Sequence, residues 1–150
     1  MKNIILLIAI ASFTFGFSQD RQGMRDKIKA QKIAFITDKL ELTVEESKEF
    51  WPIYNRFEET TNNIKRNDLK PIKKKMKSSE ELSNAEADAL LNQFIEAENE
   101  MHTAKVKMMN DLKKVISSEK IIRLKAAEDE FNRKLLERLR EYRKNKSRND

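Results

Sequence analysis

The segment 84–115 restricts the fold most, because its apolar residues recur at intervals of three or four positions without a break. Side chains at this spacing lie on one face of an α-helix. A lone helix cannot bury such a stripe, so the pattern predicts a long helix packed antiparallel on another through a coiled-coil-like seam. The stripe consists of Leu90, Phe94, Ala97, Met101, Ala104, Met108, Leu112 and Val115.

Similar stripes predict three further helices. The first runs from about Met24 to Leu40, and the second and fourth begin near Thr43 and Ser117. With only two Gly, two Pro and 37% charged residues, the composition also favours long helices. We therefore expect an all-α fold of four helices in two long, bent hairpins, elongated or dimeric. The second stripe contains Phe50, Tyr54, Phe57, Thr61 and Ile64; the fourth contains Ile121, Leu124, Ala127, Phe131, Leu135, Leu139 and Tyr142.

The second helix contains the main interruptions. Pro52 lies inside it and predicts a kink near Lys48 to Pro52, because proline has no backbone N–H. Beyond Ile64 the helix either ends near Asn67 or continues to Met76. We favour a bent continuation past Pro71, followed by a loop at residues 78–82.

Helix starts are marked by paired residues. Thr43 with Glu46, and Ser83 with Glu86, have the spacing of a capping box, in which each side chain accepts from the other residue's backbone N–H. Ser117 or Ser118 is expected to cap the fourth helix. The order apolar, hydroxyl, any residue, acid occurs twice, beginning at Leu42 and at Ile116, which suggests that one hairpin unit is used twice.

The first eighteen residues have the pattern of a cleavable signal peptide. Lys2 precedes an apolar run, and Gly16 and Ser18 are small residues at the spacing that signal peptidase requires. Cleavage is expected after Ser18, with cleavage after Gln19 or an uncleaved anchor as alternatives. Removal of Lys2 would lower the net charge from +6 to +5. We expect a flexible segment over 19–27, a helical domain over 28–142 and a basic flexible tail over 143–150.

The stretch from Ile36 to Tyr54 and its looser echo at Ile116 resemble the LTxxQ-motif, or Spy/CpxP-like, family of periplasmic proteins, and most closely the branch labelled "sensor of ECF-type sigma factor". Glu46 and Lys120 stand where the family motif has glutamine, and Ile116 and Ser117 where it prefers Leu and Thr. The resemblance covers about Lys27 to Tyr142. It implies a four-helix, hairpin-based subunit that forms a cradle-shaped dimer.

The resemblance also implies function: ATP-independent, chaperone-like holding of unfolded envelope proteins in the envelope stress response. The alternative is a regulatory partner that docks on an envelope-stress sensor, of the two-component or the ECF sigma/anti-sigma type. A metal-responsive sensor is a third hypothesis. Expected partners are unfolded envelope proteins or a sensor domain, together with a second copy of the chain in a homodimer.

Catalysis and cofactor binding are not expected. The sequence lacks a Ser–His–acid set, a Gly-rich phosphate loop and zinc-ligand spacing, and helix capping accounts for the carboxylates near Glu46. Glu98 and His102 lie one helical turn apart and are the only metal-ligand candidates. Two ligands make a poor site, so we expect a solvated histidine and no cofactor.

Binding candidates come from aromatic, thioether and basic side chains. The adjacent Phe50 and Trp51 cannot both face one seam, so one of them is expected at an interface. A positive surface in 70–77 or 133–148 would attract acidic chains or anionic lipid rather than nucleic acid in an exported protein. The client- or partner-binding candidates are Trp51, Tyr54, Lys73, Lys74, Lys75 and Met109, the last as an exposed thioether.

Overall fold

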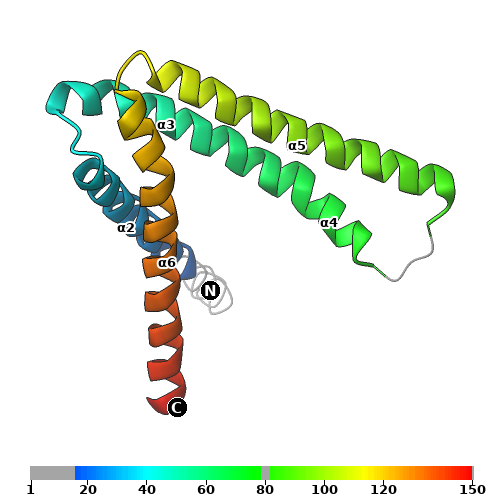
Figure 1. The fold of residues 1–150 in the computed structure, drawn as a ribbon. Coiled ribbons are helices and arrows are strands. Elements are labelled where there is room, and N and C mark those ends of the chain that lie inside the picture. The colour runs from blue at the N-terminus through cyan, green and yellow to red at the C-terminus, as the bar shows by residue number, and fades with distance from the viewer. Residues whose placement is uncertain (1–15, 79–81, 150) are drawn as a thin grey trace, which may run out of the picture. The chain divides into compact units, whose positions relative to one another are not determined.

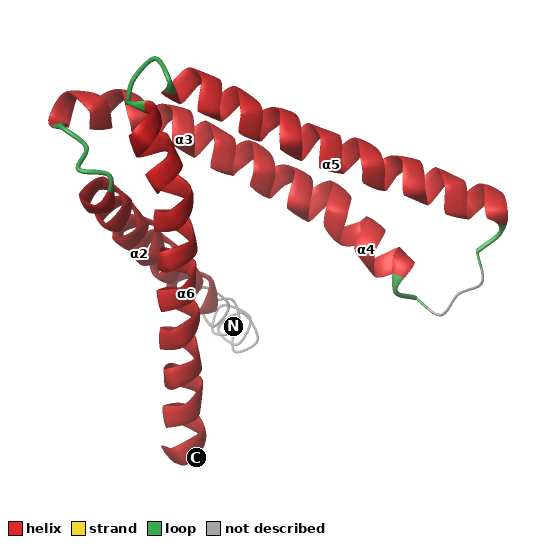
Figure 2. Ribbon diagram, viewed as in Figure 1, coloured by secondary structure: helices red, strands yellow, loops and turns green. Residues whose placement is uncertain are grey.

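The structure is a computed structural model that describes residues 16–78 and 82–149 (Figure 1). Every regular element in these residues is helical, as Figure 2 shows, which confirms the all-α prediction. The elements are α2 (Gly16–Lys39), α3 (Val44–Ile64), η1 (Lys65–Leu69), α4 (Lys70–Met76), α5 (Asn84–Leu112) and α6 (Ser118–Asn149).

The chain divides into two compact units. Unit 2 runs from Leu42 to Ile122 without a break in sequence, whereas unit 1 combines the described residues up to Glu41 with those from Arg123 onward. Helix α6 therefore starts in unit 2 and continues in unit 1.

Unit 2 is a long helical hairpin, with α3, η1 and α4 lying along α5 (Figure 1). The apolar stripes face each other, because Phe50, Tyr54 and Leu112 are fully buried and Ile64 packs with Ala97 in the middle of the hairpin. The predicted antiparallel packing of the second and third helices is confirmed. Val115 lies just beyond the end of α5, in a turn.

The second helix continues past Ile64, as favoured from the sequence, but through a π-helical segment. The N–H of Lys70 donates to the carbonyl of Lys65, five residues earlier. Pro71 follows directly, and its lack of an N–H leaves a regular α-helical ladder incomplete at this point. The π-turn absorbs this interruption and allows Leu69 and Ile72 to remain buried. Pro52 lies inside an α3 that is continuous from Val44 to Ile64.

Unit 1 pairs α2 with the later part of α6. The rings of Phe35 and Phe131 have centroids 5.7 Å apart, and Ile36, Leu40 and Leu124 are buried with them. Among the described residues, α3 and α5 form a hairpin of sequence neighbours, whereas unit 1 is built from two separate parts of the chain. Helices α2 and α6 come from opposite ends of the described chain, and non-local packing rather than a short loop joins them.

The outer helices extend further than the sequence suggested. Helix α2 begins at Gly16 and includes residues 19–27, and α6 continues through 143–149 to Asn149. The first segment contains Gln, Arg and Lys and the second contains Arg and Lys, all of which are good helix formers, and neither segment contains proline. Helical backbone there does not need burial, because exposed charged side chains are compatible with a solvated helix.

Residues 1–15 of the expected signal peptide lie outside the described residues. The small residues Gly16 and Ser18 form the start of α2. Within the part of the chain that the structure describes, no helix combines the length and hydropathy needed to cross a membrane.

Candidate functional site

The first motif caps α3 as predicted. Thr43 Oγ1 accepts from the N–H of Glu46 at 3.2 Å, and Glu46 Oε2 accepts from the N–H of Thr43 at 2.9 Å. Leu42 is half-buried beside this cap. The second predicted box, Ser83 with Glu86, also forms at the start of α5, and its hydrogen bonds from Ser83 lower the pKa of Glu86.

The second motif caps α6 through Ser117, the first of the two serines considered. Its hydroxyl accepts from the N–H of Lys120 at 3.3 Å, and Ile116 before it is buried. A lysine at this third helical position has no acceptor with which to complete the box. Its ammonium group is therefore available for another partner.

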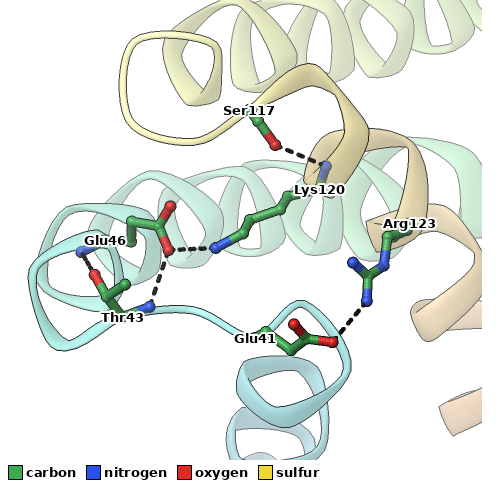
Figure 3. A network of polar contacts seen from close by, with 6 residues as sticks. All are labelled: Glu41, Thr43, Glu46, Ser117, Lys120 and Arg123. Atoms are coloured by element: carbon green, nitrogen blue, oxygen red, sulfur yellow. Dashed lines mark hydrogen bonds and ion pairs between the residues drawn. The ribbon is translucent and has the colours of Figure 1, made fainter.

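That partner is the first motif. Figure 3 shows the Lys120 side chain extended toward Glu46, with Nζ 2.6 Å from Oε2. The hydrogen bond from Lys120, followed by that from the Thr43 N–H, lowers the pKa of Glu46 against the opposing effect of desolvation. The third helical residues of the two motifs, Glu46 and Lys120, thus form one ion pair. We call Thr43, Glu46, Ser117 and Lys120 the motif junction.

Unit 1 has a separate ion pair near the end of α2. Arg123 donates to Glu41 at 3.1 Å, and Glu41 is the one described non-glycine residue with positive φ, at 49°. Helices often end on a residue in this left-handed region, usually glycine. A glutamate there is strained by roughly 1 kcal/mol, and the hydrogen bond to Arg123 helps to hold it.

A groove runs along one flank of the unit 2 hairpin, between α3–η1–α4 and α5. It consists of three hollows of about 130, 570 and 380 Å³. Thr60 and Ala104 line both the first and the second hollow, while Glu96 and Glu100 line both the second and the third. Because neighbouring hollows share lining residues, they follow one another along this flank, and we call the row the hairpin groove.

The lining of the hairpin groove changes along its length. Its middle is bordered by Ile64 and Ile95. Toward the π-turn, Asp68 joins Glu96 and Glu100, so this end is acidic. An elongated site with an apolar centre and a charged end suits an extended or helical polypeptide better than a compact substrate.

The basic candidates of α4 lie on the surface of the same unit. Lys73, Lys74 and Lys75 are exposed, and Met76 beside them has 51% of its surface exposed. Lys73 Nζ lies 3.8 Å from Glu98 and 5.7 Å from the centroid of the Phe94 ring. We call Lys73, Lys74, Lys75 and Met76 of α4 the basic end.

The aromatic candidates differ in burial, as expected for adjacent residues of one helix. Phe50 and Tyr54 are fully buried, whereas Trp51 is half-buried. Trp51 packs edge-on against Phe50 at 5.0 Å and against Tyr54 at 5.6 Å. Tyr54 is therefore a core residue, and Trp51 is the member of the cluster that reaches the surface.

Of the remaining candidates, Met109 is less exposed than predicted. Met109 is half-buried, not exposed as predicted, because its position on α5 lies near the seam formed by Met108 and Leu112. Glu98 and His102 are both exposed. Among the described residues, no group of three or more His, Cys, Asp or Glu side chains is placed to hold a metal ion.

The link between Glu46 and Lys120 and the hairpin groove were not predicted from the sequence. The only available signal for the link was the spacing of 74 residues between the two motifs, with opposite charges at matching positions. Comparison with protein-family models, curated proteins and solved structures finds no match for this chain.

Proposed function

We propose that this protein is an exported, non-enzymatic binding protein that holds partly unfolded envelope proteins without ATP. The hairpin groove is the observation on which the proposal depends. It offers open hollows with apolar surface between Ile64 and Ile95, and it lies in the same unit as the exposed lysines and Met76 of the basic end.

Two kinds of contact would act in sequence. The lysines of the basic end attract acidic segments over distances of about a Debye length, roughly 8–10 Å at physiological salt. The groove then receives apolar side chains of the captured segment. Because the groove is open and partly acidic, it binds weakly and releases clients that fold.

The proposed location, the periplasm, depends on export of the chain. The N-terminal apolar run and small-residue site predict transport to the periplasm and cleavage near Ser18 or Gln19. Cell fractionation, with mass spectrometry of the mature chain, tests this. A full-length protein retained in the cytoplasm would contradict it.

The binding test measures aggregation of a reduced or heated client with the mature protein in molar excess and without ATP. We expect suppression, and we expect Thr60→Trp to weaken it severalfold, because an indole at this exposed position fills the junction of two hollows. Asn62→Trp is the matched control, since Asn62 is an exposed residue of the same helix that does not line the groove. Unchanged aggregation in the presence of the unmodified protein would refute the proposal.

A third variant separates capture from holding. Replacing Lys73, Lys74 and Lys75 together by Gln should slow capture of an acidic client and reduce its dependence on salt.

Capture from envelope extract distinguishes the regulatory alternative. Many clients in varying amounts support the holding function, whereas one membrane protein in stoichiometric amount indicates a partner of a stress sensor.

A further inference from the structure

The C-terminal part of α6 carries the excess positive charge of the chain. Residues 133–149, which we call the terminal arm, contain eight Arg or Lys and two Glu, a net charge of +6. The whole chain also has a net charge of +6, so basic and acidic residues balance over the remainder. Helix α6 continues through the terminal arm to Asn149, and a regular helix therefore fixes the direction in which each charge lies.

The terminal arm also has exposed apolar side chains at helical spacing. Leu136, Leu139 and Tyr142, which we call the terminal stripe, are 55%, 36% and 66% exposed. Intervals of three residues place Leu136 and Tyr142 about 60° to either side of Leu139 around the helix. The three side chains thus form one apolar face along the arm.

Helix α2 contacts the terminal arm on another flank. Lys134 Nζ lies 4.8 Å from the centroid of the Phe35 ring, and Arg138 donates to Gln31 at 3.4 Å. Lys134 and Arg138 lie about 140° and 100° around the helix from Leu139, both on the same side. The packing of unit 1 therefore leaves the terminal stripe exposed.

The charges of the arm are divided between opposite faces. Glu137 and Glu141 are each two positions from Leu139, about 200° around the helix, so both acidic residues lie on the face opposite the stripe. Arg143 and Arg140 lie about 40° and 100° from Leu139 and border the stripe. One face of the arm is therefore apolar and basic, and the other carries its two carboxylates.

We propose that the terminal arm lies in the plane of an anionic phospholipid surface and docks there through the terminal stripe. The two leucines and the Tyr142 ring enter the boundary between headgroups and acyl chains, with the phenol hydroxyl at headgroup level. The guanidinium groups of Arg140 and Arg143 bind lipid phosphates, and Glu137 and Glu141 face water. The contact is interfacial, since no helix in the described part of the chain has the length and hydropathy to span a membrane.

Charge complementarity distinguishes lipid from the other occupants of such a face. A second copy would bring one arm of charge +6 against another, and like charges at an interface are unfavourable. An acidic protein segment would satisfy the arginines, but it would also need an apolar surface beside its carboxylates. A phospholipid surface provides a layer of negative charge with apolar chains directly beneath it, which matches both parts of the face.

Cosedimentation of the mature protein with vesicles tests the proposal without any client, so its failure would leave the client-holding proposal unaffected. We expect binding to vesicles of phosphatidylglycerol and phosphatidylcholine in equal amounts, and no binding to phosphatidylcholine alone. Leu136→Gln/Leu139→Gln keeps the net charge and suits a helix. It should weaken binding about tenfold or more, with unchanged helix content by circular dichroism.

Two variants that each lack two positive charges locate the docking face. Arg140→Gln/Arg143→Gln should weaken binding about tenfold or more, because both arginines border the terminal stripe. Lys144→Gln/Arg148→Gln is the matched control, at exposed positions about 140° and 180° from Leu139, and it should weaken binding less than about threefold. Equal losses would mean that net charge alone attracts the vesicles and would overturn the proposed face.

Orientation is tested with single cysteines, which the natural chain lacks. An environment-sensitive fluorophore on Leu139→Cys should shift to shorter wavelength on the anionic vesicles, whereas the same label on Glu137→Cys should not. Equal shifts of the two labels would overturn the in-plane orientation.

Three further results would overturn the proposal as a whole. The first is absence of binding to the anionic vesicles, or binding that Leu136→Gln/Leu139→Gln leaves unchanged. The second is a dimer in light scattering that this leucine variant dissociates, which would assign the terminal stripe to a second copy. The third is binding of a glutamate–tyrosine copolymer as tight as that of the vesicles, which would assign the stripe to an acidic polypeptide.

Discussion

The two units of this chain use different means to hold a pair of helices. Unit 2 packs fully buried Phe50, Tyr54 and Leu112 between helices that one loop connects. Unit 1 has a shorter apolar seam, supplemented by ion pairs such as that between Lys39 and Glu130 at 3.0 Å. Lys134 also lies 4.8 Å from the centroid of the Phe35 ring.

The order of the two units along the chain predicts that they depend on each other unequally. Helix α2 and the later part of α6 are separated in sequence by all of unit 2, and bringing them together costs loop-closure entropy. The motif junction reduces this cost, because Glu46 and Lys120 hold the two ends of unit 2 close together. We therefore expect unit 1 to require a folded unit 2, while unit 2 does not require unit 1.

The largest expected effect comes from Phe50→Ala. Emptying this fully buried site should destabilise unit 2 by about 3–5 kcal/mol. Amide hydrogen exchange should then become faster in α3 and α5. It should also become faster in α2, although Phe50 lies in unit 2 and α2 in unit 1. If α2 kept its protection while α3 lost it, the dependence of unit 1 on unit 2 would be disproved.

Leu124→Ala tests the opposite case, in which unit 1 is destabilised in place of unit 2. The side chain is 2% exposed in unit 1, so its truncation should cost about 2–5 kcal/mol locally. Exchange should accelerate in α2 and in α6 beyond Arg123, with α3 and α5 unaffected. Leu136→Ala is the control on the same helix, at a residue 55% exposed, and should change stability by less than about 0.5 kcal/mol. Loss of protection throughout unit 2 would show that the units fold as one.

The two capping boxes of unit 2 test the dependence of unit 1 on unit 2 with smaller losses of stability. Thr43→Ala and Ser83→Ala should each cost about 1 kcal/mol, measured from denaturant midpoints. Only Thr43→Ala should also speed exchange in α2, because only that cap belongs to the motif junction. Thr43→Asn should restore stability, since asparagine is an equally good cap. Equal effects of the two Ala variants on α2 would argue against a role for the junction.

The smallest effect is the pH dependence of the junction. The folded-state pKa of Glu46 is lowered, first by the hydrogen bond from Lys120 and then by that from the Thr43 N–H. Its contribution is therefore present above the pKa of an unfolded glutamate and is lost as pH falls through the lower folded-state pKa. Urea midpoints of Glu46→Gln should be lower near neutral pH and should fall less on acidification.

The control for this variant is Glu49→Gln, at an exposed carboxylate of the same helix. It should keep the acid dependence of the unmodified protein. If the two variants showed the same pH profile, the Glu46–Lys120 pair would have no measurable part in acid stability.

Much of the fold was accessible from the sequence because its signals are local. The spacing of Leu90, Ala97 and Met108 predicts a helix and its buried face, and Thr43 or Ser83 with a glutamate three residues later predicts where a helix starts. Each signal involves residues within one or two helical turns. The hydrogen bonds of the two helix caps likewise join residues that are three positions apart in the sequence.

Features that depend on neighbours in space were not accessible in this way. The sequence favoured continuation past Pro71, but it did not predict the π-turn through which the helix continues or the burial of Leu69 and Ile72 that accompanies it. The half-buried state of Met109 and the course of the hairpin groove likewise follow from how α3 lies on α5. Helical periodicity alone does not specify which flank of a hairpin stays open.

By itself the sequence determined that this protein is helical, where its capped helices begin and which stripes α3 and α5 bury, because backbone hydrogen bonding and side-chain period are properties of neighbouring residues. The predicted stripe of α6 is buried only in its first part, since Leu139 and Tyr142 are exposed. Only the tertiary structure decided that α2 pairs with α6 and that Glu46 meets Lys120. Those choices join residues separated by all or most of unit 2, and many apolar stripes of similar length would satisfy the same local pattern. Their selection rests on the sum of packing and charge complementarity across the fold.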